Sequence, residues 1–136
     1  MPVFGKDSKL NTYFVTNNRS FLYCYQLKNG TEPVKDFLDS LDDKMRAKML
    51  RAIKLLKENG NTLRDPDSKN ISNGIFELRA KIGTNISRVL YFFFVGNKAV
   101  LTNGFIKKSQ KTPIKEIEKA QKYKDDFLNR YGDING

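Results

Sequence analysis

Three strand-like segments lead straight into a helix-like segment in the C-terminal half of the chain, and this order constrains the fold more than any other feature. The expected strands cover residues 75–82, 86–95 and 98–107. Apolar and polar residues alternate in the first strand, whereas the second is apolar on both faces through its middle, as in a central strand covered on both sides. Turn-forming residues at 83–85 and 96–97 predict consecutive antiparallel strands. Gly104 predicts either a β-bulge or a close approach of another backbone.

Two helices are expected upstream of these strands. Thr31 and Pro33 form a helix-start signal, and apolar residues then recur with helical spacing. A second amphipathic helix begins near Asp42 or Asp43 and ends at Gly60. Together the two helices are expected to form a hairpin that packs on a sheet.

The remaining segments complete the expected topology. Ser20–Leu27 alternates between two faces and predicts a strand, and Asn61–Asn73 has the composition of a loop. Thr112 and Pro113 predict the N-cap and first residue of a C-terminal helix that ends near Tyr131. The sequence therefore predicts an α+β fold with an N-terminal strand, a two-helix hairpin, a three-stranded antiparallel meander and a C-terminal helix.

The chain has the length of one ordinary domain, with 136 residues. Residues 1–19 show no clear periodicity, and we expect them to form a poorly defined N-terminal arm. Residues 20–131 are expected to form a single domain.

The cysteine and histidine content restricts the catalytic mechanisms that this chain can use. The one cysteine, Cys24, lies in an alternating apolar run and is expected to be a small buried hydrophobe. The absence of histidine excludes Ser/His/Asp and Cys/His nucleophilic sites, and we expect neither a metal nor another cofactor. The longest apolar run, residues 89–95, is too short to span a membrane, and no signal peptide is recognisable, so we expect a cytoplasmic protein without a membrane partner.

Positive charge is concentrated in the block that carries the expected meander and helix. Residues 75–124 contain eleven Lys and Arg against three Glu, which is +8 of the chain's formal +10. A solvated surface ordinarily mixes both signs. One-sided charge interleaved with aromatic residues therefore indicates a nucleic-acid partner.

The candidate site residues are basic and phenolic groups near strand ends. They are Arg79, Lys81, Arg88, Tyr91, Lys107 and Lys108, with Gln110 and Lys111 just beyond the last strand. Arginine binds phosphate in a bidentate manner, and a desolvated lysine can act as a base. RNA brings its own nucleophile, the 2′-hydroxyl, so such a site can cleave RNA without histidine or metal. Hydrolysis of DNA would call for clustered carboxylates, and the expected sheet offers only Glu77.

Each candidate also has a purely structural interpretation. The lysines after the last strand could solvate a sheet edge, and Arg79 could simply pair with Glu77. Tyr91 lies in an aromatic run that fits a core better than a base-stacking platform. Arg88 lies beside the most apolar segment, where a charge with neither partner nor ligand is costly, and this favours a functional role. Whether Arg79 and Arg88 share a face depends on strand register, which the sequence leaves open.

In order and spacing, GIFELRAK, SRVLYFFF and GFIKKSQKTPIKEIEKA resemble the RelE/ParE superfamily of type II toxins, in its HigB-like, phage-derived branch. The resemblance covers roughly residues 20–131, including PVKDFLDSL upstream. It implies a RelE-like fold and an mRNA interferase that cuts transcripts, often on the ribosome, and so inhibits translation. It also implies an antitoxin from a neighbouring gene, expected to be a helix-turn-helix DNA-binding protein, that silences the toxin within a hetero-oligomer.

The resemblance further assigns roles to single residues. Positions associated with activity in such toxins correspond to Arg79, Arg88, Lys107 and Lys108, with phosphate binding and neutralisation of transition-state charge as the implied roles. The further candidates for RNA contact are Lys81, Tyr91, Gln110 and Lys111. The chain departs from the family in having Ser87 where an aromatic residue is frequent, and in lacking the catalytic histidine of many relatives. The general base therefore stays open among Lys81, Lys107, Lys108 and Glu77.

Three functions are compatible with these observations. The first is a metal-independent endoribonuclease that leaves cyclic phosphate and 5′-hydroxyl ends. A ParE-like inhibitor of DNA gyrase would share the fold, but such proteins tend to lack a basic catalytic face. A non-catalytic RNA- or ribosome-binding module would account for the +8 region equally well.

Overall fold

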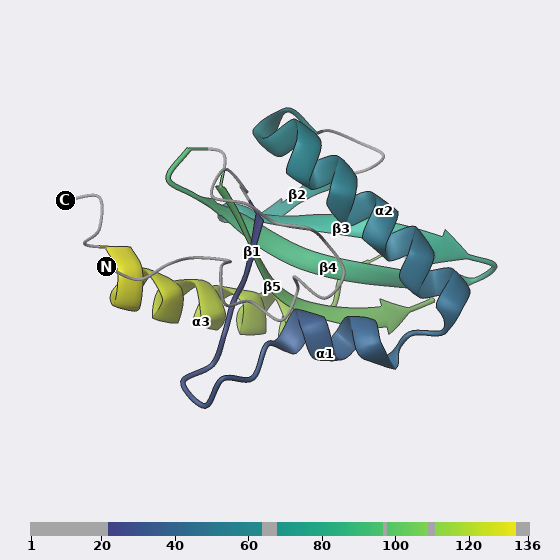
Figure 1. Ribbon diagram of the computed structural model, residues 1–136, viewed down its shortest axis with the longest axis horizontal. Helices are drawn as coiled ribbons and strands as arrows, with labels where there is room; N and C mark the ends of the chain where they lie inside the picture. The colour runs from purple at the N-terminus through teal and green to yellow at the C-terminus, as the bar shows by residue number, and fades with distance from the viewer. Residues whose placement is uncertain (1–21, 64–67, 97, 109–110, 133–136) are drawn as a thin grey trace.

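The computed structural model describes residues 22–63, 68–96, 98–108 and 111–132, so the expected arm at residues 1–19 lies outside the described part. The elements are β1 (Leu22–Cys24), α1 (Pro33–Ser40), α2 (Asp43–Asn59), the 3₁₀ helix η2 (Gly60–Thr62), β2 (Ser68–Ser72), β3 (Ile75–Ile82), β4 (Asn85–Phe94), β5 (Lys98–Lys107) and α3 (Ile114–Tyr131). The predicted α+β fold class is confirmed. Helices α1 and α2 lie on one face of the sheet and α3 lies on the other (Figure 1).

The sheet has five strands in the order β1-β5-β4-β3-β2. The four strands from β2 to β5 pair antiparallel, so the predicted meander of β3, β4 and β5 is confirmed. β1 instead pairs parallel with β5, which makes the sheet mixed rather than wholly antiparallel. Parallel neighbours need a crossover rather than a hairpin turn. Here two α-helices, the 3₁₀ helix η2 and three strands intervene between β1 and β5.

Two short strands differ from the sequence prediction. The segment 61–73, which was expected to be a loop, contains β2 and the last two residues of η2. The sequence of β2, SKNIS, is polar, and it becomes a strand because its backbone pairs with β3 at the sheet edge. β1 has three residues, fewer than the expected strand over Ser20–Leu27, whose first two residues lie outside the described part.

Other boundaries follow the sequence signals closely. α1 begins at Pro33, and α2 begins after Asp42, whose side chain accepts a hydrogen bond from the backbone N–H of Met45 at 2.9 Å. Gly60 ends α2 with a φ of +56°. β4 ends one residue earlier than expected, because Val95 has a φ of +55° and belongs to the turn.

Two apolar clusters fill the space between the sheet and its helices. In the first, α1 and α2 contribute Leu38 and Met49. In the second, Phe127 of α3 packs edge-on against Phe92 of β4, with ring centroids 5.6 Å apart. Cys24 is partly rather than fully buried and packs against the first cluster. None of the helices in the described ranges is long and apolar enough to cross a membrane.

Gly104 marks a close approach rather than a bulge. A Cβ at this position would lie 2.3 Å from Cδ2 of Phe37, so glycine allows α1 to pack directly on β5. The bulge lies two residues earlier, where the register shifts between Leu90 and Tyr91 and leaves Thr102 as the extra residue of β5.

Candidate functional site

The strand register brings basic residues of β3, β4 and β5 onto one face of the sheet. Arg79 lies opposite Arg88, and Arg88 lies opposite Phe105, so these residues form a row across the strands. Lys81 and Lys107 lie in the next row, both opposite the same residue of β4. Because residues two apart in a strand point to the same side, both rows face the side that α3 occupies.

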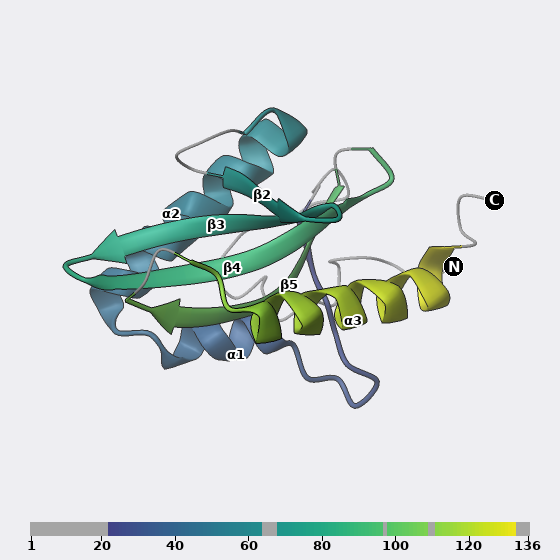
Figure 2. The ribbon, with the colours of Figure 1, turned by 180° about the vertical axis from the view of Figure 1, so that it is seen from behind.

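Helix α3 covers only part of this face. Figure 2 shows α3 running from the middle of the sheet away from the turn between β3 and β4, so no helix of the described chain covers the half beside that turn. The Arg79 side chain is 24% exposed, and four lysines are exposed nearby or in the segment that follows β5. These five residues, which we call the basic cluster, are Arg79, Lys81, Lys107, Lys108 and Lys111.

One buried carboxylate organises the inner side of the basic cluster. Glu77 is fully buried, and its Oε1 accepts a hydrogen bond from Nε of Arg79. Its Oε2 accepts a hydrogen bond from the hydroxyl of Thr112, and Nε of Arg88 lies 3.9 Å from Oε1. Glu77 therefore joins β3, β4 and the segment before α3, and it fixes the guanidinium of Arg79.

Arg88 lies beneath the basic cluster rather than at its surface. Its side chain is 0% exposed, and Nη1 donates a hydrogen bond to the carbonyl of Lys111 at 3.1 Å. The guanidinium lies 5.9 Å from the centroid of the Phe105 ring. Burial lowers the pKa of Arg88, and the charge of Glu77 opposes this effect. The protein thus supplies partners for the charge of Arg88. The sequence argument for a functional role assumed that Arg88 had neither partner nor ligand, and that assumption does not hold. Through its hydrogen bond, Arg88 holds the backbone of Lys111 in place.

Besides Arg88, two sequence candidates do not join the basic cluster. Tyr91 is buried in the core on the face that carries α1 and α2, where its hydroxyl shares a hydrogen bond with that of Ser68. Its ring also stacks with Phe76 at a centroid distance of 5.5 Å. The core interpretation of Tyr91 is therefore confirmed, and its buried ring offers no surface for a base. Gln110 lies outside the described residues.

Sequence reasoning missed the role of Thr112. It predicted Thr112 as the N-cap of the last helix, but Pro113 occupies that position and α3 begins at Ile114. The nearly buried Thr112 hydroxyl donates a hydrogen bond to the buried carboxylate of Glu77, and such a bond to a charged acceptor is stronger than one to a neutral group. A Thr–Pro pair before a helix gives no sign of a partner 35 residues earlier in the chain.

The basic cluster has the chemistry of a surface that binds polyanions. All five of its residues are cationic, and the carboxylate beside them, Glu77, is already engaged. Neighbouring strands lie about 4.8 Å apart, so side chains from adjacent strands can contact successive oxygens of a phosphodiester backbone. Among the residues with described positions, no group of three or more His, Cys, Asp or Glu side chains is placed to hold a metal ion.

The fold and the basic cluster define a small α+β protein with basic side chains on an open sheet face. The family model described as "Phage derived protein Gp49-like (DUF891)" matches residues 36–125, and the chain belongs to this family. It is a toxin-like family associated with RelE and HigB, and membership is compatible with the toxin of a toxin–antitoxin pair. The match includes the whole basic cluster. A search of curated proteins found no match.

Proposed function

We propose that this protein is the toxin of a toxin–antitoxin pair and acts as an mRNA interferase on transcripts that occupy the ribosome. The observation that carries the proposal is the register of β3, β4 and β5, which gathers Arg79, Lys81 and Lys107 on one open sheet face. Lys108 and Lys111 extend this positive surface. The Gp49-like family supports a toxin, and RNA supplies the nucleophile that this histidine-free chain lacks.

The proposed reaction is attack of the ribose 2′-oxygen on the adjacent phosphorus. A cyclic phosphate forms, and the bond from phosphorus to the 5′-oxygen breaks. Arg79, Lys107 and Lys108 would bind the non-bridging oxygens and stabilise the additional negative charge of the pentavalent transition state. The 2′-hydroxyl loses its proton to a base and the departing 5′-oxygen gains one, so the product ends carry a cyclic phosphate and a 5′-hydroxyl.

The general base in this proposal is a lysine of the basic cluster that loses its proton when bound RNA displaces the surrounding water. Glu77 was a contender in the sequence, but it is buried and its oxygens already accept hydrogen bonds from Arg79 and Thr112. Lys81, Lys107 and Lys108 remain. Arginine keeps the charge of lysine but does not lose its proton, so Lys→Arg replacement at each of these positions separates a base from a phosphate-binding group.

The proposed partner is an antitoxin with an acidic segment that covers the basic cluster. Such a segment would be complementary to the charge of the cluster and would block access of RNA. The helix-turn-helix class expected from the sequence resemblance would place this antitoxin on DNA, with the toxin held in a hetero-oligomer.

Mapping of transcript ends shortly after induction, with and without a block on ribosome initiation, tests the proposal. Cuts in codon register that disappear with the block are the expected result. Arg79→Ala and Lys107→Ala should each reduce cleavage by about 100-fold or more, because each removes a group that stabilises transition-state charge. Lys54→Ala is the matched control, since Lys54 is an exposed lysine of α2 on the opposite face of the sheet.

Other outcomes would identify the alternative functions. Intact transcripts in arrested cells that contain folded protein would contradict RNA cleavage. Poisoned supercoiling in those cells would indicate a ParE-like inhibitor of gyrase, and RNA binding without cleavage would indicate a non-catalytic module.

A further inference from the structure

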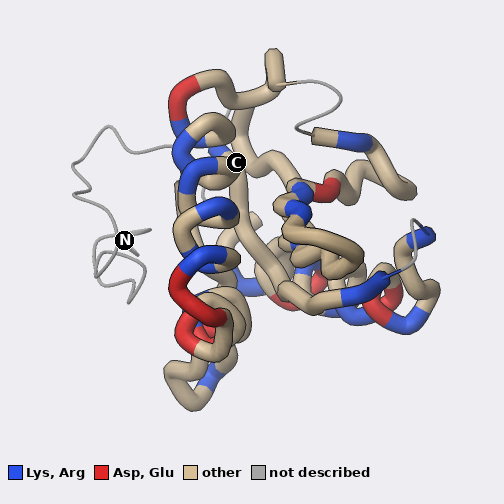
Figure 3. Tube along the Cα trace, turned by 90° about the vertical axis from the view of Figure 1, so that its right-hand side faces the viewer, with Lys and Arg blue, Asp and Glu red and all other residues tan. Residues whose placement is uncertain are grey.

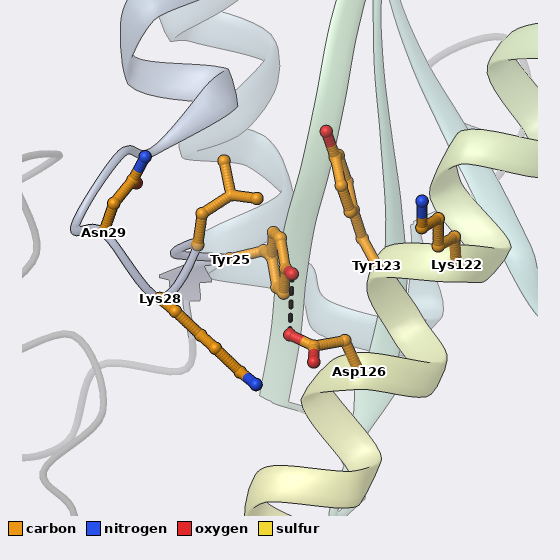
Figure 4. A pocket seen from close by; sticks show the side chains of 7 residues that line it. Tyr25, Lys28, Asn29, Lys122, Tyr123 and Asp126 are labelled. Carbon is orange, nitrogen blue, oxygen red and sulfur yellow. Dashed lines mark hydrogen bonds between the residues drawn. The ribbon is translucent and has the colours of Figure 1, made fainter.

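A cavity of about 500 Å³ lies away from the basic cluster, between α3 and the segment that connects β1 to α1. Figure 4 shows Tyr25 and Tyr123 side by side within it, with Lys28 and Asn29 on the connecting segment and Lys122 on α3. Its volume is in the range of sites that bind small molecules.

The inner wall of the cavity is aromatic and firmly held. The rings of Tyr25 and Tyr123 stack with centroids 4.5 Å apart and planes 20° apart. The Tyr25 hydroxyl donates to Asp126 at 2.7 Å, and Arg130 pairs with the same carboxylate at 2.7 Å. Tyr25 is almost fully buried, whereas Tyr123 is partly exposed and therefore offers a ring surface to a ligand.

The charge available to a ligand at this cavity is positive. The one acidic residue of its lining, Asp126, is already engaged by Tyr25 and Arg130. Lys28 and Lys122 are exposed at the rim, on opposite sides of the aromatic wall in Figure 4. A ligand with a planar aromatic part and a nearby negative charge fits this combination.

A line of lysines joins the basic cluster to the cavity. Lys115, Lys119 and Lys122 are exposed on α3 at helical spacings of four and three, so they lie along one side of the helix. Nζ of Lys119 also lies 3.7 Å from Oε1 of Glu116, which already accepts a hydrogen bond from Asn103 at 3.1 Å, so the exposed Lys119 can turn to a phosphate instead. The line spans about 10 Å along the helix axis, beginning close to Lys111 of the basic cluster.

We propose that the cavity is a stacking subsite for an unpaired base of the RNA strand that the basic cluster holds. The strand's phosphates follow the lysines of α3, and the base lies against Tyr123 while Lys28 and Lys122 contact its phosphate. A single-stranded RNA explains both features, because its phosphates can follow the lysines of α3 while an unpaired base lies against the aromatic wall. The inference rests on the proposed RNA substrate, and its test does not need cleavage.

Binding of nucleotides to the full chain tests the subsite directly. Uridine 5′-monophosphate and adenosine 5′-monophosphate should shift the NMR signals of the Tyr123 ring, and ribose 5-phosphate should not, because it lacks a base. Glutamyl-phenylalanine serves as the probe for an acidic aromatic segment of a protein. Shifts by the dipeptide and not by the nucleotides would overturn the RNA assignment.

Affinity for a 2′-O-methylated single-stranded oligonucleotide, which cannot be cleaved by 2′-hydroxyl attack, provides the second test. Tyr123→Ala should weaken binding about tenfold, the effect of losing one stacked base, while Tyr123→Phe should bind within about twofold of the wild type. Lys122→Glu and Lys28→Glu should also weaken binding of the oligonucleotide. These two variants test the subsite if the Tyr123→Ala protein does not fold. Lys54→Glu is the charge-matched control on the far face.

Failure of the subsite and failure of the proposed function give different results. A chain that cleaves no RNA but whose Tyr123 signals respond to nucleotides loses the proposed activity and keeps the subsite. The opposite result is RNA cleavage by the wild type together with unchanged oligonucleotide affinity in the Lys28→Glu, Lys122→Glu and Tyr123→Ala variants. It would support the proposed activity and contradict the subsite.

Discussion

At the scale of single residues, Glu77 shows how one buried carboxylate can hold a group of cations in place. An acidic side chain is seldom buried unless it is paired, and Glu77 accepts hydrogen bonds from Arg79 and Thr112. The pairing of Arg79 with Glu77 was the purely structural interpretation of the sequence, and it is present. It does not exclude a ligand, because the Arg79 side chain is also 24% exposed.

Glu77→Gln should lower the free energy of unfolding by about 3 kcal/mol, because it leaves the buried Arg88 without its counter-charge. Urea unfolding followed by circular dichroism measures this difference. Asp39→Asn is the control: its pair with Lys35 is exposed and should contribute less than about 1 kcal/mol. A Glu77→Gln protein as stable as the control would contradict a structural role for the buried carboxylate.

The Tyr25 hydroxyl should make stability pH-dependent in alkaline solution. Burial, with the hydrogen bond to Asp126, raises the pKa of Tyr25 from 10.0 to about 12. The folded protein therefore keeps this proton where the unfolded chain has lost it, so the contribution is complete below pH 10.0 and is lost as the pH rises to about 12. Tyr25→Phe should remove roughly 2 kcal/mol of the alkaline decline seen in urea unfolding across this range. Equal declines in both proteins would show that Tyr25 is not responsible.

At the scale of elements, a helix or strand could be predicted where the residues that determine it are neighbours in the sequence. The helices were recognisable because their apolar residues repeat with helical spacing and their ends carry residues such as Pro33 and Gly60. β2 was not recognisable, because an edge strand that buries little needs no hydrophobic pattern. The sequence located the cations of the candidate site. Whether Arg79 lies opposite Arg88 depends on the register of two strands, which the sequence does not determine. The contact of Thr112 with Glu77 has no local sequence signal at all.

The packing of α1 on β5 depends on Gly104. Gly104→Ala places a methyl group against the Phe37 ring and should destabilise the protein by about 1–3 kcal/mol. Phe37→Leu should restore part of this loss when the two changes are combined, since a smaller side chain leaves room for the methyl group. Gly132→Ala is the control, because no atom lies within 4 Å of a Cβ there. Urea unfolding of the four variants would measure the coupling, and additive effects would contradict the contact.

At the scale of the whole molecule, positive charge lies on both sides of the sheet. Figure 3 shows Lys and Arg along α2 and along parts of the sheet and α3, while α2 carries acidic residues at its ends. The basic cluster is the place where this charge combines with an open sheet face. The sequence indicated the charge, but the open face follows from where α3 begins.

The affinity for single-stranded RNA should fall as the salt concentration rises, with the logarithm of the affinity decreasing linearly with the logarithm of the salt concentration. Each phosphate contact contributes a slope of about −0.7, so Lys111→Ala should make the slope shallower by about that amount for any RNA sequence. Fluorescence anisotropy of the 2′-O-methylated oligonucleotide in a series of KCl concentrations measures it. Lys54→Ala should leave the slope unchanged, and an unchanged slope for Lys111→Ala would remove that lysine from the binding surface.

The parallel pairing of β1 with β5 places Leu22 opposite Ala99, so the first and last strands of the described chain are neighbours in the sheet. A nascent polypeptide cannot close such a sheet until β5 has emerged from the ribosome, and β5 is made after β1, α1, α2 and the other three strands. Lys107 at the end of β5 takes its place in the basic cluster at the same moment. The order of synthesis thus delays assembly of the basic cluster until the whole segment from β1 to β5 has been made.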